Sequence, residues 1–220
     1  MAGRFAFHLI TDRGAAADLL GAVREALAGG VDWVQVRDKA APAADLYDLA
    51  RRVQELADEA GAGLLVNDRV DVAVAVGAAG VHLARRSLPP EVARRLVPPG
   101  TLVGVSVHSL EEAVQAAQVG ADYVTFGSVF PTRSHPGGLP RGLDELARVV
   151  ESVSVPVLAI GGITAENARE VAATGVAGVA VISGVLGAAD PRAAAVALRE
   201  ALEGSPARPR VPFPPPGRRP

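Results

Sequence analysis

The chain has 220 residues, a formal net charge of −2 and no cysteine. This charge argues against binding to nucleic acid or to a membrane surface through bulk electrostatics. The lack of cysteine excludes a disulfide framework, a thiolate nucleophile and a thiolate metal site. The N-terminus has no hydrophobic signal stretch, and no run reaches the ~18 apolar residues of a membrane span. We therefore expect a cytoplasmic protein that binds neither nucleic acid nor membrane.

Short apolar segments alternate along the chain with stretches of helical periodicity. The expected strands are 5–10, 33–36, 64–66, 80–83, 102–105, 123–126, 156–160 and 179–182. The expected helices are 18–28, 45–60, 69–76, 90–96, 110–119, 143–151, 165–173 and 191–202. Near-continuous apolar strands that alternate with helices are typical of a parallel sheet covered by helices.

Eight such units predict an α/β fold, a single (β/α)8 TIM barrel, over residues 1–203. An open doubly wound sheet is the alternative. It is disfavoured because the turn after the first expected strand, residues 11–15, lacks the GxGxxG fingerprint of dinucleotide-binding folds. Residues 204–220 are rich in proline and arginine. We expect them to form a disordered tail that contributes nothing to the barrel.

Polar residues follow the second expected strand with a spacing of two. Gln35, Arg37 and Lys39 therefore leave the strand on the same face. Of the 22 lysine and arginine residues, Lys39 alone is a lysine. In a TIM barrel the active site lies at the C-terminal ends of the strands. These three side chains are consequently predicted to hold an anion.

The last two strand ends predict a phosphate site. Gly161 and Gly162 follow the seventh strand, and Ser183 and Gly184 follow the eighth. Loops at these positions often bind phosphate in TIM barrels, because glycine lets backbone amides approach the anion. The long polar loop 127–141 adds hydroxyl donors and a histidine. Its candidate site residues are Thr132, Ser134 and His135.

Two further strand ends carry polar candidates. Asn67 and Asp68 follow the third strand, where Asp68 is either a Mg²⁺ ligand or the N-cap of the next helix. Ser106 and His108 follow the fifth strand. His135 is the first candidate for proton transfer and His108 the second, because His108 also lies at a helix entry.

Seven ordered motifs over residues 5–202 resemble the thiamine-phosphate synthases and their TenI-type paralogues, the thiazole tautomerases. They are QVRDK at 35–39, VNDRVDV at 66–72, GVHL at 80–83, GVS at 104–106, GSVFPT at 127–132, AIGGI at 159–163 and VIS at 181–183. The resemblance implies a (β/α)8 barrel that binds thiazole phosphate in thiamine biosynthesis.

The resemblance also implies roles for single residues. In a synthase, hydroxymethylpyrimidine diphosphate loses pyrophosphate and the thiazole nitrogen traps the pyrimidine carbocation. Asp68 would then bind Mg²⁺, and Ser106 would lie near the pyrimidine. The diphosphate would be held by Gln35, Arg37, Lys39 and Asn67. The thiazole phosphate would be held by Thr132, Ser134, Gly162, Ile182 and Ser183.

The chain departs from the synthase pattern at two positions. Ser87 stands where the family has a second Mg²⁺ carboxylate, and His135 stands where it has a lysine. A thiazole tautomerase moves a proton and needs no Mg²⁺, so these departures favour a tautomerase as the main interpretation. Its characteristic histidine is Ser128 here, and His135 and then His108 are the candidates to replace it.

Two alternatives therefore stay open. One is a Mg²⁺-dependent synthase that joins the pyrimidine diphosphate to thiazole phosphate, and the other is a non-catalytic thiazole-phosphate binder. The expected small-molecule partner is a phosphorylated thiazole in each case, with the pyrimidine diphosphate added for a synthase. The sequence leaves open whether the chain forms a homo-oligomer.

Overall fold

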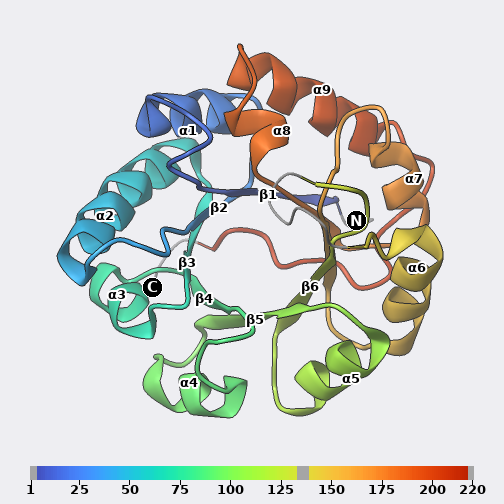
Figure 1. Cartoon of the computed structure of the whole chain (residues 1–220), viewed down its shortest axis with the longest axis horizontal. Helices are drawn as coiled ribbons and strands as arrows, with labels where there is room; N and C mark the ends of the chain where they lie inside the picture. The colour runs from blue at the N-terminus through green and yellow to red at the C-terminus, as the bar shows by residue number, and fades with distance from the viewer. Residues whose placement is uncertain (1–3, 133–138, 218–220) are drawn as a thin grey trace.

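The computed structural model describes residues 4–132 and 139–217. Within these residues, eight parallel strands form a closed barrel in sequential order, with helices on the outside (Figure 1). The strands are β1 (Ala6–Ile10), β2 (Trp33–Val36), β3 (Gly63–Asn67), β4 (Gly80–Leu83), β5 (Leu102–Val107), β6 (Tyr123–Gly127), β7 (Val157–Ile160) and β8 (Gly178–Val181).

The helices follow the strands in regular alternation. They are α1 (Leu19–Ala28), α2 (Ala43–Ala60), α3 (Val70–Val76), α4 (Pro90–Leu96), α5 (Leu110–Gln118), α6 (Gly142–Ser152), α7 (Ala168–Ala173), α8 (Ser183–Leu186) and α9 (Pro191–Glu203). The (β/α)8 prediction is therefore confirmed. The short helix α8, which directly follows β8, was not expected from the sequence. No helix in the described ranges is both long and apolar enough to span a membrane.

Local sequence explains where several helices begin. Ser109 has an extended backbone, and its hydroxyl accepts a hydrogen bond from the Glu112 amide at the start of α5. Asp190 accepts from the Ala193 amide in the same way, and Pro191 occupies the first turn of α9. These side chains satisfy amides that have no partner within the helix, and proline needs none at this position.

The N-terminal end of the barrel interior is filled by two large rings, Trp33 and Tyr123. Each ring faces a glycine on a neighbouring strand. A Cβ at Gly63 would lie 2.3 Å from the Trp33 ring, and a Cβ at Gly104 would lie 2.0 Å from that of Tyr123. Because such distances are far below van der Waals contact, the two glycines provide the space in which the rings pack.

The C-terminal segment contradicts the prediction of a disordered tail. Residues 204–217 run back across the barrel, and Phe213 is buried at its N-terminal end against His8, Trp33 and Tyr123 (Figure 1). The Arg210 amide donates to the Gly175 carbonyl at 2.9 Å. Composition alone did not predict this packing. Burial of one phenylalanine ring at the end of the barrel stabilises the segment, although the sequence around it is polar and rich in proline.

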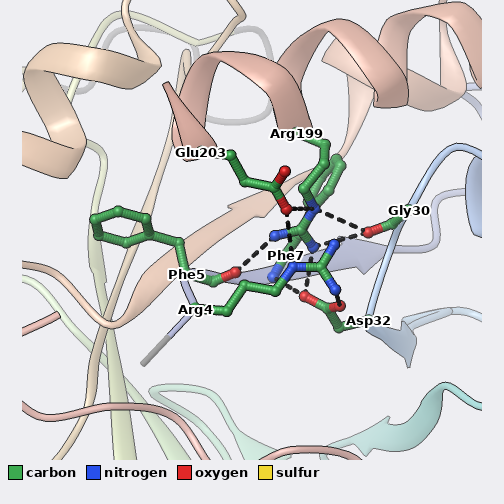
Figure 2. A network of polar contacts seen from close by, with 7 residues as sticks. All are labelled: Arg4, Phe5, Phe7, Gly30, Asp32, Arg199 and Glu203. Atoms are coloured by element: carbon green, nitrogen blue, oxygen red, sulfur yellow. Dashed lines mark hydrogen bonds and ion pairs between the residues drawn. The ribbon is translucent and has the colours of Figure 1, made fainter. Parts of the chain in front are cut away.

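A buried arginine connects α9 to the first two strands (Figure 2). The Arg199 guanidinium donates to the carbonyls of Phe5 and Gly30 at 2.7 Å each, and lies 2.5 Å from the Asp32 carboxylate. Asp32 also accepts from the Phe7 amide at 2.8 Å. The same guanidinium lies 5.3 Å from the centre of the Phe7 ring. The last helix is thereby held against the start of the barrel by polar contacts that are largely screened from water.

Candidate active site

A cavity of about 1050 Å³ opens at the C-terminal ends of the strands. It contains side chains from loops that follow strands all around the barrel. Of the candidates named from the sequence, those that line it are Gln35, Arg37, Lys39, Asn67, Asp68, Ser106, His108, Thr132, Gly162, Ile182 and Ser183. Ser134 and His135 lie outside the described residues. The structure thus brings these candidates together around one cavity, and the role of each residue remains a prediction.

A chain of hydrogen bonds joins the barrel interior to Asp68. Gln35 Nε2 donates to Asn67 Oδ1 at 2.9 Å, and Asn67 Nδ2 donates to Asp68 Oδ2 at 2.7 Å. An ionised carboxylate only accepts, so Asn67 must turn its amide nitrogen toward Asp68 and its oxygen toward Gln35. The orientation of both amides follows from the Asp68 charge.

Asp68 itself is held at the wall of the cavity. It has a backbone φ of 62°, in the left-handed region that aspartate tolerates better than most residues. Its Oδ1 accepts from the Ala84 amide at 3.1 Å and from the Ser87 hydroxyl. Helix α3 takes Arg69 as its N-cap, with no side-chain capping bond. The N-cap interpretation of Asp68 is therefore wrong, and the carboxylate belongs to the cavity.

The oxygen atoms around Asp68 fit a Mg²⁺ ion that is bound partly by the protein and partly by a substrate. Magnesium prefers oxygen donors, and it is commonly bound by one or two carboxylates together with water and substrate phosphates. Asp68 supplies one carboxylate and Ser87 a neighbouring hydroxyl. In the described part of the chain, no cluster of three or more His, Cys, Asp or Glu side chains forms a complete metal cage.

Positive charge gathers on the same side of the cavity. Arg37 and Lys39 come from the β2 end, and Arg85 and Arg86 from the loop after β4. Arg37 is anchored because its backbone amide donates to the Thr11 hydroxyl at 2.8 Å, and that hydroxyl donates to the Arg37 carbonyl at 3.1 Å. Lys39 is exposed at the cavity mouth. Together these side chains can hold an anion of high charge.

The wall formed after β7 and β8 has a different character. Gly161 and Gly162 have φ values of 101° and 65°, which only glycine adopts readily. Asn167 braces this turn, since its side chain accepts from the Thr164 amide and donates to the Gly162 carbonyl, both at 2.9 Å. Ser183 and Gly184 lie on the wall of the same cavity. This backbone geometry leaves room for a phosphate to approach, and the phosphate site stays a prediction.

His108 lies at the edge of the cavity, where α5 begins. Its Nδ1 is 3.3 Å from Glu112 Oε2, and its backbone amide donates to the same oxygen at 2.7 Å. Both residues line the cavity, and the imidazole is partly exposed. The ring therefore has an acidic partner, but it also helps to close the first turn of the helix.

Sequence reasoning assigned no role to His82 and Tyr123, which form a buried polar pair; His82 lines the cavity, and Tyr123 does not. His82 Nδ1 is 3.0 Å from the Tyr123 hydroxyl, and His82 Nε2 is 2.8 Å from the Ser106 hydroxyl. Burial lowers the pKa of His82 to about 4, an effect that the negative charge of Asp68 partly opposes. Burial also raises the pKa of Tyr123 above its ordinary value. At neutral pH both side chains are therefore uncharged.

Comparisons with known proteins identify the family of this chain. The family model for thiamine monophosphate synthase matches residues 7–185. The chain belongs to this family. A thiamine-phosphate synthase of Pyrococcus furiosus is 47% identical over 196 residues, covering 89% of this chain and 94% of that protein. One from Roseiflexus castenholzii is 47% identical over 199 residues, covering 89% and 87%.

The chain also resembles a solved structure in both fold and sequence. Thiamine phosphate pyrophosphorylase from Pyrococcus furiosus superimposes with a TM-score of 0.84 at 47% identity, covering 90% of this chain and 96% of that one. The chain is accordingly an enzyme of thiamine biosynthesis. The relatives carry the synthase name, which supports the synthase alternative better than the tautomerase that we favoured from the sequence.

Proposed function

We propose that the chain is a thiamine-phosphate synthase that joins hydroxymethylpyrimidine diphosphate to thiazole phosphate and releases pyrophosphate. The observation that carries this proposal is that one cavity has two sides of different chemistry, each suited to an anion. One is the cationic side with Arg37 and Lys39, beside the Asp68 carboxylate, and the other is the glycine-rich side with Gly162 and Ser183. A synthase must hold two phosphorylated substrates at once, whereas a tautomerase holds only one.

The cationic side is suited to the diphosphate. Arg37 and Lys39 would bind its oxygens directly, and Gln35 and Asn67 would add hydrogen bonds from below. Arg85 and Arg86 directly precede Ser87 and line the cavity. Ser87 stands where the family has its second Mg²⁺ carboxylate. Guanidinium groups bind phosphate oxygens in a bidentate manner, so these arginines can absorb part of the charge that a second metal ligand would help to neutralise.

The glycine-rich side is suited to the single phosphate of the thiazole. Gly162, Ile182 and Ser183 would surround it, with Thr132 from the loop after β6. Ser134 is proposed for the same role and lies outside the described residues. This arrangement would hold the thiazole by its phosphate on the other side of the cavity from the diphosphate, so that the thiazole nitrogen could face the pyrimidine between them.

The reaction breaks the bond between the pyrimidine methylene carbon and the diphosphate oxygen. The electron pair of that bond leaves with pyrophosphate, and the lone pair of the thiazole nitrogen forms the new carbon–nitrogen bond. The nitrogen carries no proton at the start, so no base has to remove one. The residues of the cavity therefore contribute by binding, by orienting the two rings and by stabilising the leaving group.

Mg²⁺ bound at Asp68 and Ser87 would neutralise charge on the diphosphate as it leaves. The chain's own part is to hold that carboxylate in place. The bonds from Asn67, Ala84 and Ser87 fix both oxygens of Asp68 before any substrate binds. A tautomerase needs no Mg²⁺ and would therefore not need this carboxylate as a metal ligand.

The experiment is a direct comparison of the two reactions with purified protein. Both synthase substrates with Mg²⁺ should give thiamine phosphate and pyrophosphate in equal amounts, and chelation of the metal with EDTA should abolish the reaction. In a parallel assay, the non-aromatic thiazole carboxylate phosphate isomer should be converted no faster than in buffer. Rapid isomerisation without formation of thiamine phosphate would overturn the proposal in favour of the tautomerase.

A further inference from the structure

The hydroxyl group of Tyr123 has an unusual setting at the bottom of the barrel. The residue is 1% exposed, and within the described ranges the one hydrogen-bond partner of its hydroxyl is His82 Nδ1, at 3.0 Å. The side chain is a phenol rather than a phenolate, because burial raises its pKa. A buried O–H without an acceptor is costly, so the proton of this phenol must lie on the line to Nδ1.

This requirement fixes the tautomer of His82. Nδ1 has to accept the Tyr123 proton, so it carries no hydrogen of its own. A neutral imidazole carries one hydrogen, which must then be on Nε2. The Nε2–H group lies 2.8 Å from the Ser106 hydroxyl oxygen and donates to it. The direction of both hydrogen bonds thus follows from the burial of a single phenol.

The His82 tautomer also determines the hydrogen bonds that Ser106 can form in the cavity. Its oxygen accepts from His82, so its own proton is not used by this pair. Ser106 lines the cavity and is partly exposed to it. With the opposite histidine tautomer, the serine would spend its proton on Nε2 and offer only lone pairs to a ligand. The tautomer of His82 therefore decides whether Ser106 donates or only accepts.

The surroundings hold the Tyr123 ring in place and limit the access of water to it. The Phe213 ring lies 4.9 Å from that of Tyr123 and covers it from below. Gly104 leaves room for the phenol, since a Cβ there would lie 2.4 Å from the Tyr123 hydroxyl oxygen. Both features hold the ring at one position and limit the access of water, which would otherwise supply an alternative acceptor.

We propose that Tyr123 and His82 are positioning residues that make the Ser106 hydroxyl a hydrogen-bond donor to an acceptor atom of the pyrimidine substrate. This inference rests on the proposed synthase function for the identity of the ligand, although the protein part of it does not. A ring nitrogen of the pyrimidine is an acceptor of the required kind. The pair would select a substrate that presents such an atom at the depth of Ser106.

The first test needs no substrate. Nitrogen-15 NMR of the full chain reports which ring nitrogen of each of the four histidines carries a proton, and His82→Gln identifies the His82 signals. We expect an unprotonated Nδ1 and a protonated Nε2. In Tyr123→Phe, the Nδ1 signal should move toward that of a ring nitrogen without a hydrogen bond. A wild-type spectrum with the proton on Nδ1 would overturn the inference.

The second test is kinetic and compares two tyrosine variants. Tyr123→Phe should lower kcat/KM for the pyrimidine diphosphate by about tenfold to a hundredfold, the usual range for residues that orient a ligand-binding group. The KM for thiazole phosphate should not change. Tyr47→Phe removes the other tyrosine hydroxyl of the chain, on the exposed face of α2, and should behave as wild type.

The possible failures can be told apart. Equal kinetics for the two variants would contradict the inference. Should Tyr123→Phe not fold, the wild-type NMR spectrum still decides it. An inactive wild-type enzyme with the expected tautomer would instead contradict the synthase function and, with it, the assignment of the ligand as a pyrimidine.

Discussion

The ring of Phe213 lies 4.9 Å from that of Tyr123 in an edge-to-face arrangement with an angle of 71° between the ring planes. The two residues are 90 positions apart in the sequence, and Tyr123 begins β6. This contact brings the C-terminal segment into the interior of the barrel, next to the residues beneath the active site. The segment is thereby part of the folded domain.

Replacement of this ring should have a large effect on stability. Phe213→Ala leaves a cavity between His8, Trp33 and Tyr123, and we expect it to lower the free energy of unfolding by about 3 kcal/mol. Urea unfolding followed by circular dichroism measures the loss. Val196→Ala, at an exposed position of α9, should change stability by less than about 0.5 kcal/mol. Equal behaviour of the two variants would mean that the segment does not fill the barrel end.

The buried arginine gives a second prediction. Arg199→Met preserves much of the side-chain volume but leaves the Asp32 carboxylate and the carbonyls of Phe5 and Gly30 without this donor. Loss of one partner of a buried ion pair typically costs about 3–5 kcal/mol, so a strong decrease of the melting temperature is expected. Arg192→Met, on the exposed face of the same helix, is the control. A melting temperature close to that of the control would refute the structural role.

The pH dependence of stability should reflect His82. Its pKa is about 4 in the folded chain and ordinarily 6.5, so the unfolded chain binds more protons between these values. The contribution of His82 to the free energy of unfolding is fully present above pH 6.5. It decreases as the pH falls below 6.5, by about 2 kcal/mol at pH 5. His8, whose pKa burial also lowers, acts in the same direction. Urea unfolding at pH 7 and pH 5 measures the slope, and His82→Gln should reduce it. An unchanged slope in the variant would contradict the assignment.

Lys39 provides a prediction for catalysis. Lys39→Met removes a cation from the diphosphate side of the cavity, and we expect kcat/KM for the pyrimidine diphosphate to fall by about a hundredfold. The KM for thiazole phosphate should stay the same, since that phosphate is proposed to bind at the glycine-rich side. Arg95→Met, exposed on α4, is the matched control. Equal losses for both substrates would indicate that the two anion sites are not separate.

The sequence predicted the barrel and the position of its active site because both follow from short-range patterns. Apolar strands of four to six residues and helices with regular periodicity fix the alternation, and the polar residues just beyond Val36 and Val66 then mark one end. The family motifs imply a role for each of these residues. The rule that TIM-barrel active sites lie at the C-terminal ends of the strands then locates the expected site.

The features that the sequence did not predict depend on contacts between distant segments. His82 is separated from Tyr123 by 41 residues and from Ser106 by 24, so no local pattern links the three. A histidine within an apolar strand gives no sign of its partner. The glycines that face Tyr123 and Trp33 were the available signal, because glycine at a strand interior often marks a close approach by a large neighbour.

The Arg199 contacts bear on how the chain folds during synthesis. β1 pairs with β8 along the register from Ala6 to Leu9, and Arg199 adds bonds from α9 to Phe5, just before β1, and to Gly30, which precedes β2. The first strand to leave the ribosome therefore has one open edge until nearly the whole chain has been made. An exposed strand edge invites pairing with other chains. Pairing with β8 ends this exposure, and the Arg199 bonds from α9 to Phe5 and Gly30 then hold the two ends of the closed barrel together.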